Sequence, residues 1–169
     1  LKVSVTGPES TGKSEMCNSL SQHFLEPVAP EFARTFLEKH GPQYTRQDVL
    51  TMAEGQMEAE KKARMKASRI YFCDTDALNY KIWFDYRYGE VPDLVKDWLE
   101  NSDYDYTLLL HPDTPWKEDP LREYPDKRVF FFDKFEQGLK TNNIPYSIIK
   151  GTGKERFEKA IGILEKLLP

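Results

Sequence analysis

The chain has 169 residues, of which 39% are hydrophobic and 31% charged, a balance that fits one folded domain over residues 1–169 and excludes a disordered chain. Its formal net charge at pH 7 is −4, which argues against general nucleic-acid binding because that depends on a surplus of lysine and arginine. No apolar run is long enough to cross a bilayer and no signal-type segment opens the chain, so we predict a cytoplasmic protein without a membrane partner.

Strand-like and helix-like segments alternate along the chain. The predicted strands are residues 1–6, a short extended segment at 27–30, 69–74, 104–111 and 145–151. The predicted helices are residues 14–25, 31–41, 45–67 and 154–168. This alternation favours an α/β fold, a three-layer sandwich whose central sheet is mostly parallel and covered by helices on both faces.

One long segment, residues 111–128, fits neither pattern. It reads HPDTPWKEDPLREYPDKR and contains four prolines and charges of both signs. Irregular loops of this length are usually functional or disordered. We therefore predict a mobile lid loop here.

The segment GPESTGKS lies between the first predicted strand and the first predicted helix. Its pattern, Gly7-x-x-x-x-Gly12-Lys13-Ser14, is that of a phosphate-binding loop, or P-loop. The glycines let successive backbone N–H groups turn toward phosphate oxygens, Lys13 supplies a positive charge, and Ser14 offers a hydroxyl to Mg²⁺. We predict that the loop binds a nucleoside triphosphate rather than forming a plain strand-to-helix turn. The predicted nucleotide-binding residues are Gly7, Pro8, Glu9, Ser10, Thr11, Gly12, Lys13, Ser14 and Cys17.

Two acids follow the third predicted strand. Asp74 closes its apolar run, and a carboxylate there can hold the hydration shell of Mg²⁺, so Ser14 and Asp74 are the predicted metal residues. Asp76 has two open interpretations. It either takes a proton from, or orients, an acceptor hydroxyl, or it caps the next helix.

Four further charged residues are candidates for the site. Glu31 and Arg34 follow the short extended segment, at the sheet edge where ligands of α/β proteins bind. Glu31 can act as general base toward a hydroxyl and Arg34 can bind phosphate or substrate; the alternative is a helix-start acid and a solvated arginine. In the lid loop, Arg122 is the best candidate to stabilise a phosphoryl group in transfer, with Arg34 or Arg128 as additional candidates.

Several separate motifs agree with one known family. TGPESTGKS, PEFAR, FCDTDAL, LLLHPDTPWKEDPLR and YSIIKGTGKERFEKAI occur in an order and spacing that resemble the NadR-like ribosylnicotinamide kinase domain of the P-loop NTPase superfamily. The resemblance implies a nucleoside-kinase-like fold and transfer of the ATP γ-phosphate to the 5′-hydroxyl of nicotinamide riboside, giving nicotinamide mononucleotide. By this resemblance Gly12, Lys13 and Ser14 bind phosphate and Mg²⁺, Asp74 supports the metal, and Arg122 belongs to the lid.

The chain departs from the family pattern where the nicotinamide ring would bind. Pro30 stands where the resemblance leads us to expect an aromatic residue, and residues 55–63 contain none. Trp83, together with Tyr80, Tyr86 and Tyr88, can supply a replacement platform for a flat ring. The alternative is that at least two of these four aromatics face the core. The two cysteines, Cys17 and Cys73, have no disulfide or metal-site spacing and are expected to be half-buried thiols.

We therefore predict an enzyme, a small-molecule kinase that uses ATP and Mg²⁺ on a nucleoside-like acceptor. The predicted catalytic residues are Lys13, Glu31, Asp76 and Arg122, and the predicted substrate-binding residues are Glu31, Arg34, Asp76 and Trp83. The alternative is a non-catalytic nucleotide sensor, which needs a phosphate loop and a metal acid but neither a base nor a lid. Assembly into a homo-oligomer stays open.

Overall fold

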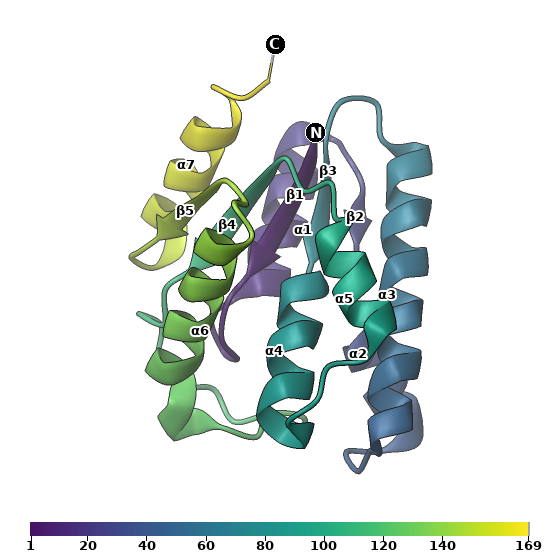
Figure 1. The fold of residues 1–169 in the computed structure, drawn as a ribbon. Helices are drawn as coiled ribbons and strands as arrows, with labels where there is room; N and C mark the ends of the chain where they lie inside the picture. Colours follow the sequence, from purple (N-terminus) through teal and green to yellow (C-terminus); the bar gives the residue numbers. More distant parts are fainter. Residues whose placement is uncertain (169) are drawn as a thin grey trace.

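A computed structural model describes residues 1–168 and contains a five-stranded sheet in the order β2-β3-β1-β4-β5 (Figure 1). The strands are β1 (Lys2–Thr6), β2 (Val28–Ala29), β3 (Tyr71–Asp74), β4 (Tyr106–Leu110) and β5 (Tyr146–Ile149). Every neighbouring pair is parallel. Parallel neighbours need long crossover connections, and helices in these connections cover the two faces of the sheet. The predicted α/β fold with a parallel central sheet is confirmed.

The helices divide between the two faces. Helices α1 (Lys13–Phe24) and α7 (Gly153–Leu164) pack on one face, and α3 (Arg46–Lys66), α4 (Ala77–Tyr88), α5 (Asp93–Glu100) and α6 (Arg128–Thr141) contribute to the core on the other. Helix α2 (Phe32–His40) packs beside α3. Figure 1 shows α4 and α6 in front of the sheet with α1 behind it.

Alternation along the strands separates two apolar cores. On β3, Phe72 packs in the core shared with α1 and α7, whereas Cys73 packs in the core shared with α3 to α6. On β4, Leu108 and Leu109 divide in the same way. Successive side chains of a strand point to opposite faces, so both faces of these central strands are buried.

The structure corrects three details of the sequence analysis. The long loop is irregular only as far as Tyr124, because residues 125–127 form a short 3₁₀ turn and Arg128 already begins α6. Helices α5 and α6 were not predicted. Cys17 and Cys73 are fully buried rather than half-buried, since each points into one of the two cores.

No helix in residues 1–168 is both long and apolar enough to cross a bilayer.

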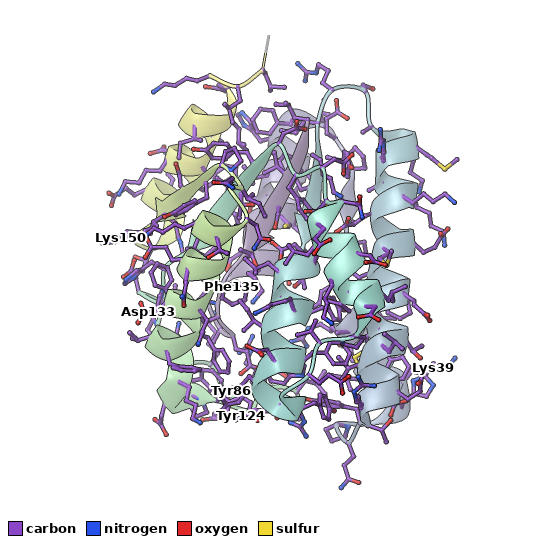
Figure 2. All side chains as sticks on the ribbon, viewed as in Figure 1. Lys39, Tyr86, Tyr124, Asp133, Phe135 and Lys150 are labelled. Atoms are coloured by element: carbon purple, nitrogen blue, oxygen red, sulfur yellow. The ribbon has the colours of Figure 1, made fainter. Side chains whose placement is uncertain are left out.

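The carboxyl ends of the strands lie at the lower end of the view in Figure 1, where the long loop between β4 and α6 also runs. The phosphate loop follows β1 at this end. In Figure 2, Tyr86 of α4 and Tyr124 of the long loop lie here, with their ring centroids 5.4 Å apart. The long loop therefore covers the edge of the sheet where α/β proteins bind their ligands.

Candidate active site

The phosphate loop has a backbone that only certain residues tolerate. Gly7 and Gly12 have φ values of 139° and 81°. A Cβ atom at Gly7 would lie 2.7 Å from the backbone oxygen of Leu110, so β4 leaves no room for a side chain at this position. Ser10 also has a positive φ, 57°, although it is not a glycine. These glycines therefore meet the conformational demand that the motif predicts.

Side-chain donors fix the carbonyl groups of the loop, and among them the Nζ of Lys13 donates to the carbonyls of Gly7 and Pro8 at 3.0 Å each. The hydroxyl of Thr11 donates to the carbonyl of Pro8 at 2.8 Å, and that of Thr114 donates to the carbonyl of Ser10 at 2.7 Å. The guanidinium of Arg156 donates to the carbonyl of Thr11 at 2.8 Å. Across a trans peptide plane the N–H points opposite to the C=O, so the amides of the loop are fixed as well, and such amides can form an anion-binding concavity.

The loop forms one wall of a cavity of about 440 Å³. Positively charged side chains from α2 and the long loop line it as well: Arg34, Lys117 and Arg122. Arg34 donates to Asp119 at 3.0 Å, and Asp119 also lies 3.9 Å from Arg122, so one carboxylate holds both guanidinium groups. The structure thus brings Arg34 and Arg122 to the same side of the predicted phosphate site, where they favour a polyanion.

Asp74 and Ser14 have the features of a site for a hard cation. Asp74 is 4% exposed, and its Oδ1 is buried with no hydrogen-bond partner among the described residues. Burial, followed by repulsion from Glu31, raises the pKa of Asp74 to about 6, while the Ser14 hydroxyl and the Lys13 charge act in the opposite direction. A buried carboxylate oxygen without a donor is suited to a cation ligand, so the donor set fits Mg²⁺.

The protein alone supplies few ligands for such an ion. Within residues 1–168 no group of three or more His, Cys, Asp or Glu side chains could hold a metal. Mg²⁺ usually keeps several waters and binds to one or two protein groups together with substrate phosphates. The site is therefore of the kind that depends on a bound nucleotide.

Asp76 is the cap of α4, which bears on its two interpretations. Its Oδ1 accepts the backbone N–H of Asn79 at 2.9 Å, and the hydroxyls of Ser4 and Thr6 donate to the same carboxylate. Asp76 is 1% exposed and lines neither of the cavities described here. Because its carboxylate is occupied by the fold, this geometry favours the helix-cap interpretation of Asp76 over the predicted catalytic and substrate-binding role.

A second cavity, of about 130 Å³, adjoins the first. Most of its lining is apolar or aromatic: Ala33, Leu37, Val49, Met52, Tyr80, Ile82, Trp83, Leu121, Phe131 and Phe135. Carboxylates of Glu9, Glu31 and Glu123 line it too. The two cavities meet at the residues that line both: Glu9, Lys13, Glu31, Ala33, Leu37 and Leu121.

Of the four aromatic residues of α4 that could form a platform for a flat ring, two line the second cavity and two do not. Trp83 and Tyr80 line the second cavity, whereas Tyr86 and Tyr88 do not. The Trp83 ring packs against Tyr124, with the centroids 5.6 Å apart, which places a residue of the long loop next to this wall. Trp83 therefore stays a candidate for substrate binding.

The structure changes the assignment of two residues, Cys17 and Arg156. Cys17 is on α1, and its side chain is fully buried in the core between α1 and the sheet. It lines neither cavity, so it is not a nucleotide contact. Burial raises the pKa of its thiol well above the ordinary value. Arg156 was not predicted, although it supports the phosphate loop. Arg156, Ala160 and Leu164 form the buried stripe of α7, and an arginine in an apolar stripe is the signal that sequence reasoning missed.

A family model described as an AAA domain matches residues 2–156. The chain belongs to this family. It is 26% identical over 175 residues to the trifunctional NAD biosynthesis/regulator protein NadR of Salmonella typhimurium and 25% identical to that of Escherichia coli. Each alignment covers 98% of this chain but only 42% of the relative, so the chain spans less than half the length of these curated relatives.

Solved structures show the same fold. A structure of NadR protein in complex with NR has a TM-score of 0.84 at 21% identity, covering 98% of this chain and 48% of that one. Deoxyadenosine kinase from M. mycoides, with products dCMP and dCDP bound, has a TM-score of 0.67 at 14% identity, covering 98% and 100%. The resemblance to NadR-like P-loop domains and the nucleoside-kinase-like fold are thereby confirmed.

Proposed function

We propose that this protein is a kinase that transfers the γ-phosphate of ATP to a hydroxyl of a nucleoside-like acceptor. The observation that supports this function is the meeting of two unlike cavities at Lys13 and Glu31. One cavity is basic and built on a phosphate loop; the other is apolar and aromatic with acidic groups at its wall. A transferase needs both, whereas a nucleotide sensor needs only the first.

Each charged group has a role in this proposal. Lys13, Arg34 and Arg122 stabilise the negative charge of the phosphates, and Mg²⁺ held beside Ser14 and Asp74 would neutralise further charge there. Glu31 accepts the proton of the acceptor hydroxyl, because it lies where the two cavities join. Glu9 lies there too, but its carboxylate already accepts the backbone N–H groups of Glu123 and Tyr124. Positioning and electrostatics supply most of the rate in such reactions.

We further propose nicotinamide riboside as the acceptor and nicotinamide mononucleotide as the product. The second cavity offers the rings of Trp83 and Tyr80 and the carboxylates of Glu9, Glu31 and Glu123. Aromatic faces and acids stabilise a flat cationic ring such as a pyridinium. The likeness to NadR proteins, which include a structure in complex with NR, supports the same choice.

The test is a phosphoryl-transfer screen with the purified protein and Mg·ATP. Nicotinamide riboside, the common ribonucleosides and deoxyribonucleosides, and a reaction without acceptor are compared by mass spectrometry. We expect nicotinamide mononucleotide as the main product. Another monophosphate would replace the acceptor and keep the kinase, whereas bound ATP with no product from any acceptor would favour the nucleotide sensor.

Two variants locate the chemistry. Glu31→Gln should remove transfer while the affinity for Mg·ATP is kept, because the amide cannot take the proton. Glu54→Gln is the matched control, since Glu54 is an exposed acid on α3 outside both cavities. Equal activity of the two variants would exclude Glu31 as the base.

A further inference from the structure

Arg128 donates hydrogen bonds to the backbone of the phosphate loop. It is the first residue of α6, immediately after the 3₁₀ turn that ends the long loop. Its Nε donates to the carbonyl of Glu9 at 3.2 Å, and its Nη2 donates to the carbonyl of Ser10 at 3.0 Å. Its Nη1 donates to the carbonyl of Thr114 at 2.8 Å. All three guanidinium nitrogens are thus bonded to backbone oxygens.

This geometry differs from that of an arginine that contacts a phosphoryl group. Arg122 lines the basic cavity, but Arg128 lines neither that cavity nor the aromatic one. From the sequence, Arg128 was a candidate to stabilise the phosphoryl group together with Arg122. The structure separates the two arginines, because Arg128 lines neither cavity and its donors are occupied by backbone carbonyls.

The carbonyls that Arg128 holds surround a strained residue. Ser10 has a φ of 57°, a conformation that is unfavourable for a residue with a side chain and persists only where its surroundings fix it. Its carbonyl accepts hydrogen bonds from both Arg128 and the hydroxyl of Thr114. Arg128 thereby fixes the carbonyls of Glu9 and Ser10, and across each trans peptide plane the N–H groups of Ser10 and Thr11, two residues that line the basic cavity, are fixed as well.

A reciprocal contact joins the loop to the lid. The Glu9 carboxylate accepts the backbone N–H groups of Glu123 and Tyr124 at 3.1 and 3.2 Å. The segment that carries Arg122 and the segment that carries the phosphate-binding amides therefore hold each other from both sides. A change at Arg128 would reach the amides of the loop through this shared scaffold.

We propose that Arg128 is a positioning residue that fixes the phosphate loop in the conformation that binds the triphosphate. It acts through the carbonyls of Glu9 and Ser10 and not by touching the nucleotide. The inference rests on the proposed function for its ligand, ATP, but it concerns nucleotide binding and needs no acceptor.

The test measures the dissociation constant of Mg·ATP by calorimetry, without acceptor. We expect Arg128→Met to weaken binding by about tenfold or more, the usual size of a lost set of charge-assisted hydrogen bonds. Arg128→Lys should be impaired nearly as much, because a lysine keeps the charge but cannot bond to three carbonyls. Arg64→Met is the matched control: Arg64 is exposed on α3, pairs with Asp103, and should leave binding within about twofold of the native protein.

The decisive comparison repeats Arg128→Met in a Ser10→Gly background. Glycine adopts a positive φ without the side-chain penalty, so the loss caused by Arg128→Met should be clearly smaller there than in the native background. An equal loss in both backgrounds, or native affinity in Arg128→Lys, would overturn the proposal in favour of a purely electrostatic or direct role.

Circular dichroism and thermal unfolding check that each variant folds; if Arg128→Met does not, Arg128→Lys carries the comparison in both backgrounds. A native protein that does not bind Mg·ATP would contradict the proposed function itself. A native protein that binds Mg·ATP but transfers no phosphate would leave the comparison of the variants valid. The two failures are therefore distinguishable.

Discussion

Two glycines in helix interiors should respond in opposite ways to the same substitution. Alanine is preferred to glycine inside a helix by about 1 kcal/mol. Gly162 of α7 has nothing within 4 Å of the position that a Cβ atom would take, so Gly162→Ala should raise the free energy of unfolding by about 0.5–1 kcal/mol. At Gly55 of α3, the added Cβ would lie 2.6 Å from Cζ of Phe32 and closer still to Cδ1 and Cε1.

The Phe32 ring must therefore retreat by about 1 Å to reach an ordinary carbon–carbon contact. Overpacking of this kind costs about 1–3 kcal/mol, which exceeds the gain in helix propensity. We expect Gly55→Ala to lower the free energy of unfolding by about 1 kcal/mol, so that the two variants differ by about 2 kcal/mol. Urea unfolding followed by circular dichroism, with equal m-values, measures this difference.

The substitution at Gly55 should also affect activity. Phe32 directly follows Glu31, and its backbone N–H donates to Gln56 of α3 at 2.8 Å, so the ring and this hydrogen bond together set the start of α2. A displaced Phe32 shifts the proposed base, and kcat should fall in Gly55→Ala but not in Gly162→Ala. If Gly55→Ala were stabilised as much as Gly162→Ala, the steric reasoning would be refuted.

Three further outcomes test the site. Lys13→Ala should reduce kcat/KM by about 100-fold or more, equivalent to about 3 kcal/mol, and unchanged ATP turnover would show that the phosphate site is misassigned. Trp83→Ala should raise the KM for the acceptor by about tenfold without changing the affinity for Mg·ATP; a loss of ATP affinity instead would place Trp83 elsewhere. Hydrogen bonds from the Leu121 backbone and from Arg34 lower the pKa of Asp119. Asp119 has a lower pKa in the folded than in the unfolded protein. Its ionised carboxylate therefore stabilises the folded protein at pH values above the ordinary pKa of about 3.9, and this stabilisation is lost as the pH falls below that value. The difference in unfolding free energy between the native protein and Asp119→Asn should therefore disappear in acid, and a difference independent of pH would contradict this linkage.

What the sequence predicted well depends on neighbours in the chain. The phosphate loop is a contiguous motif, and Thr45 and Asp48 of α3 form the capping box that their spacing predicts. Helix α6 lacks such a signal: Lys127 precedes it without a side-chain cap, and its first residue, Arg128, lies inside the segment predicted as loop. Where a helix begins without a cap, its first residue is determined by tertiary packing, which the neighbouring residues in the sequence do not predict.

The assignment of Asp76 shows the same limit at the site. Its partners Ser4 and Thr6 are 72 and 70 residues away in the chain, and they meet it only because β1 and β3 are paired neighbours. Either role was open for an acid at this position until the register of these strands was known. Glu31 was placed by a simpler rule, since the end of a parallel strand is where ligands bind.

The two sides of the proposed reaction are built differently. On the phosphate side, Thr11 is fully buried, and Arg128 and Arg156 donate to carbonyls of the loop. On the acceptor side, α2 carries Glu31 at its start and has no fully buried residue. The bond from Arg34 to Asp119 joins this lightly packed helix to the long loop. The proposed nucleotide site is thus fixed by the fold, whereas the position of the proposed base depends on a few contacts, of which Phe32 against Gly55 is one. For this reason, the methyl group that Gly55→Ala adds to α3 should lower kcat of the proposed reaction.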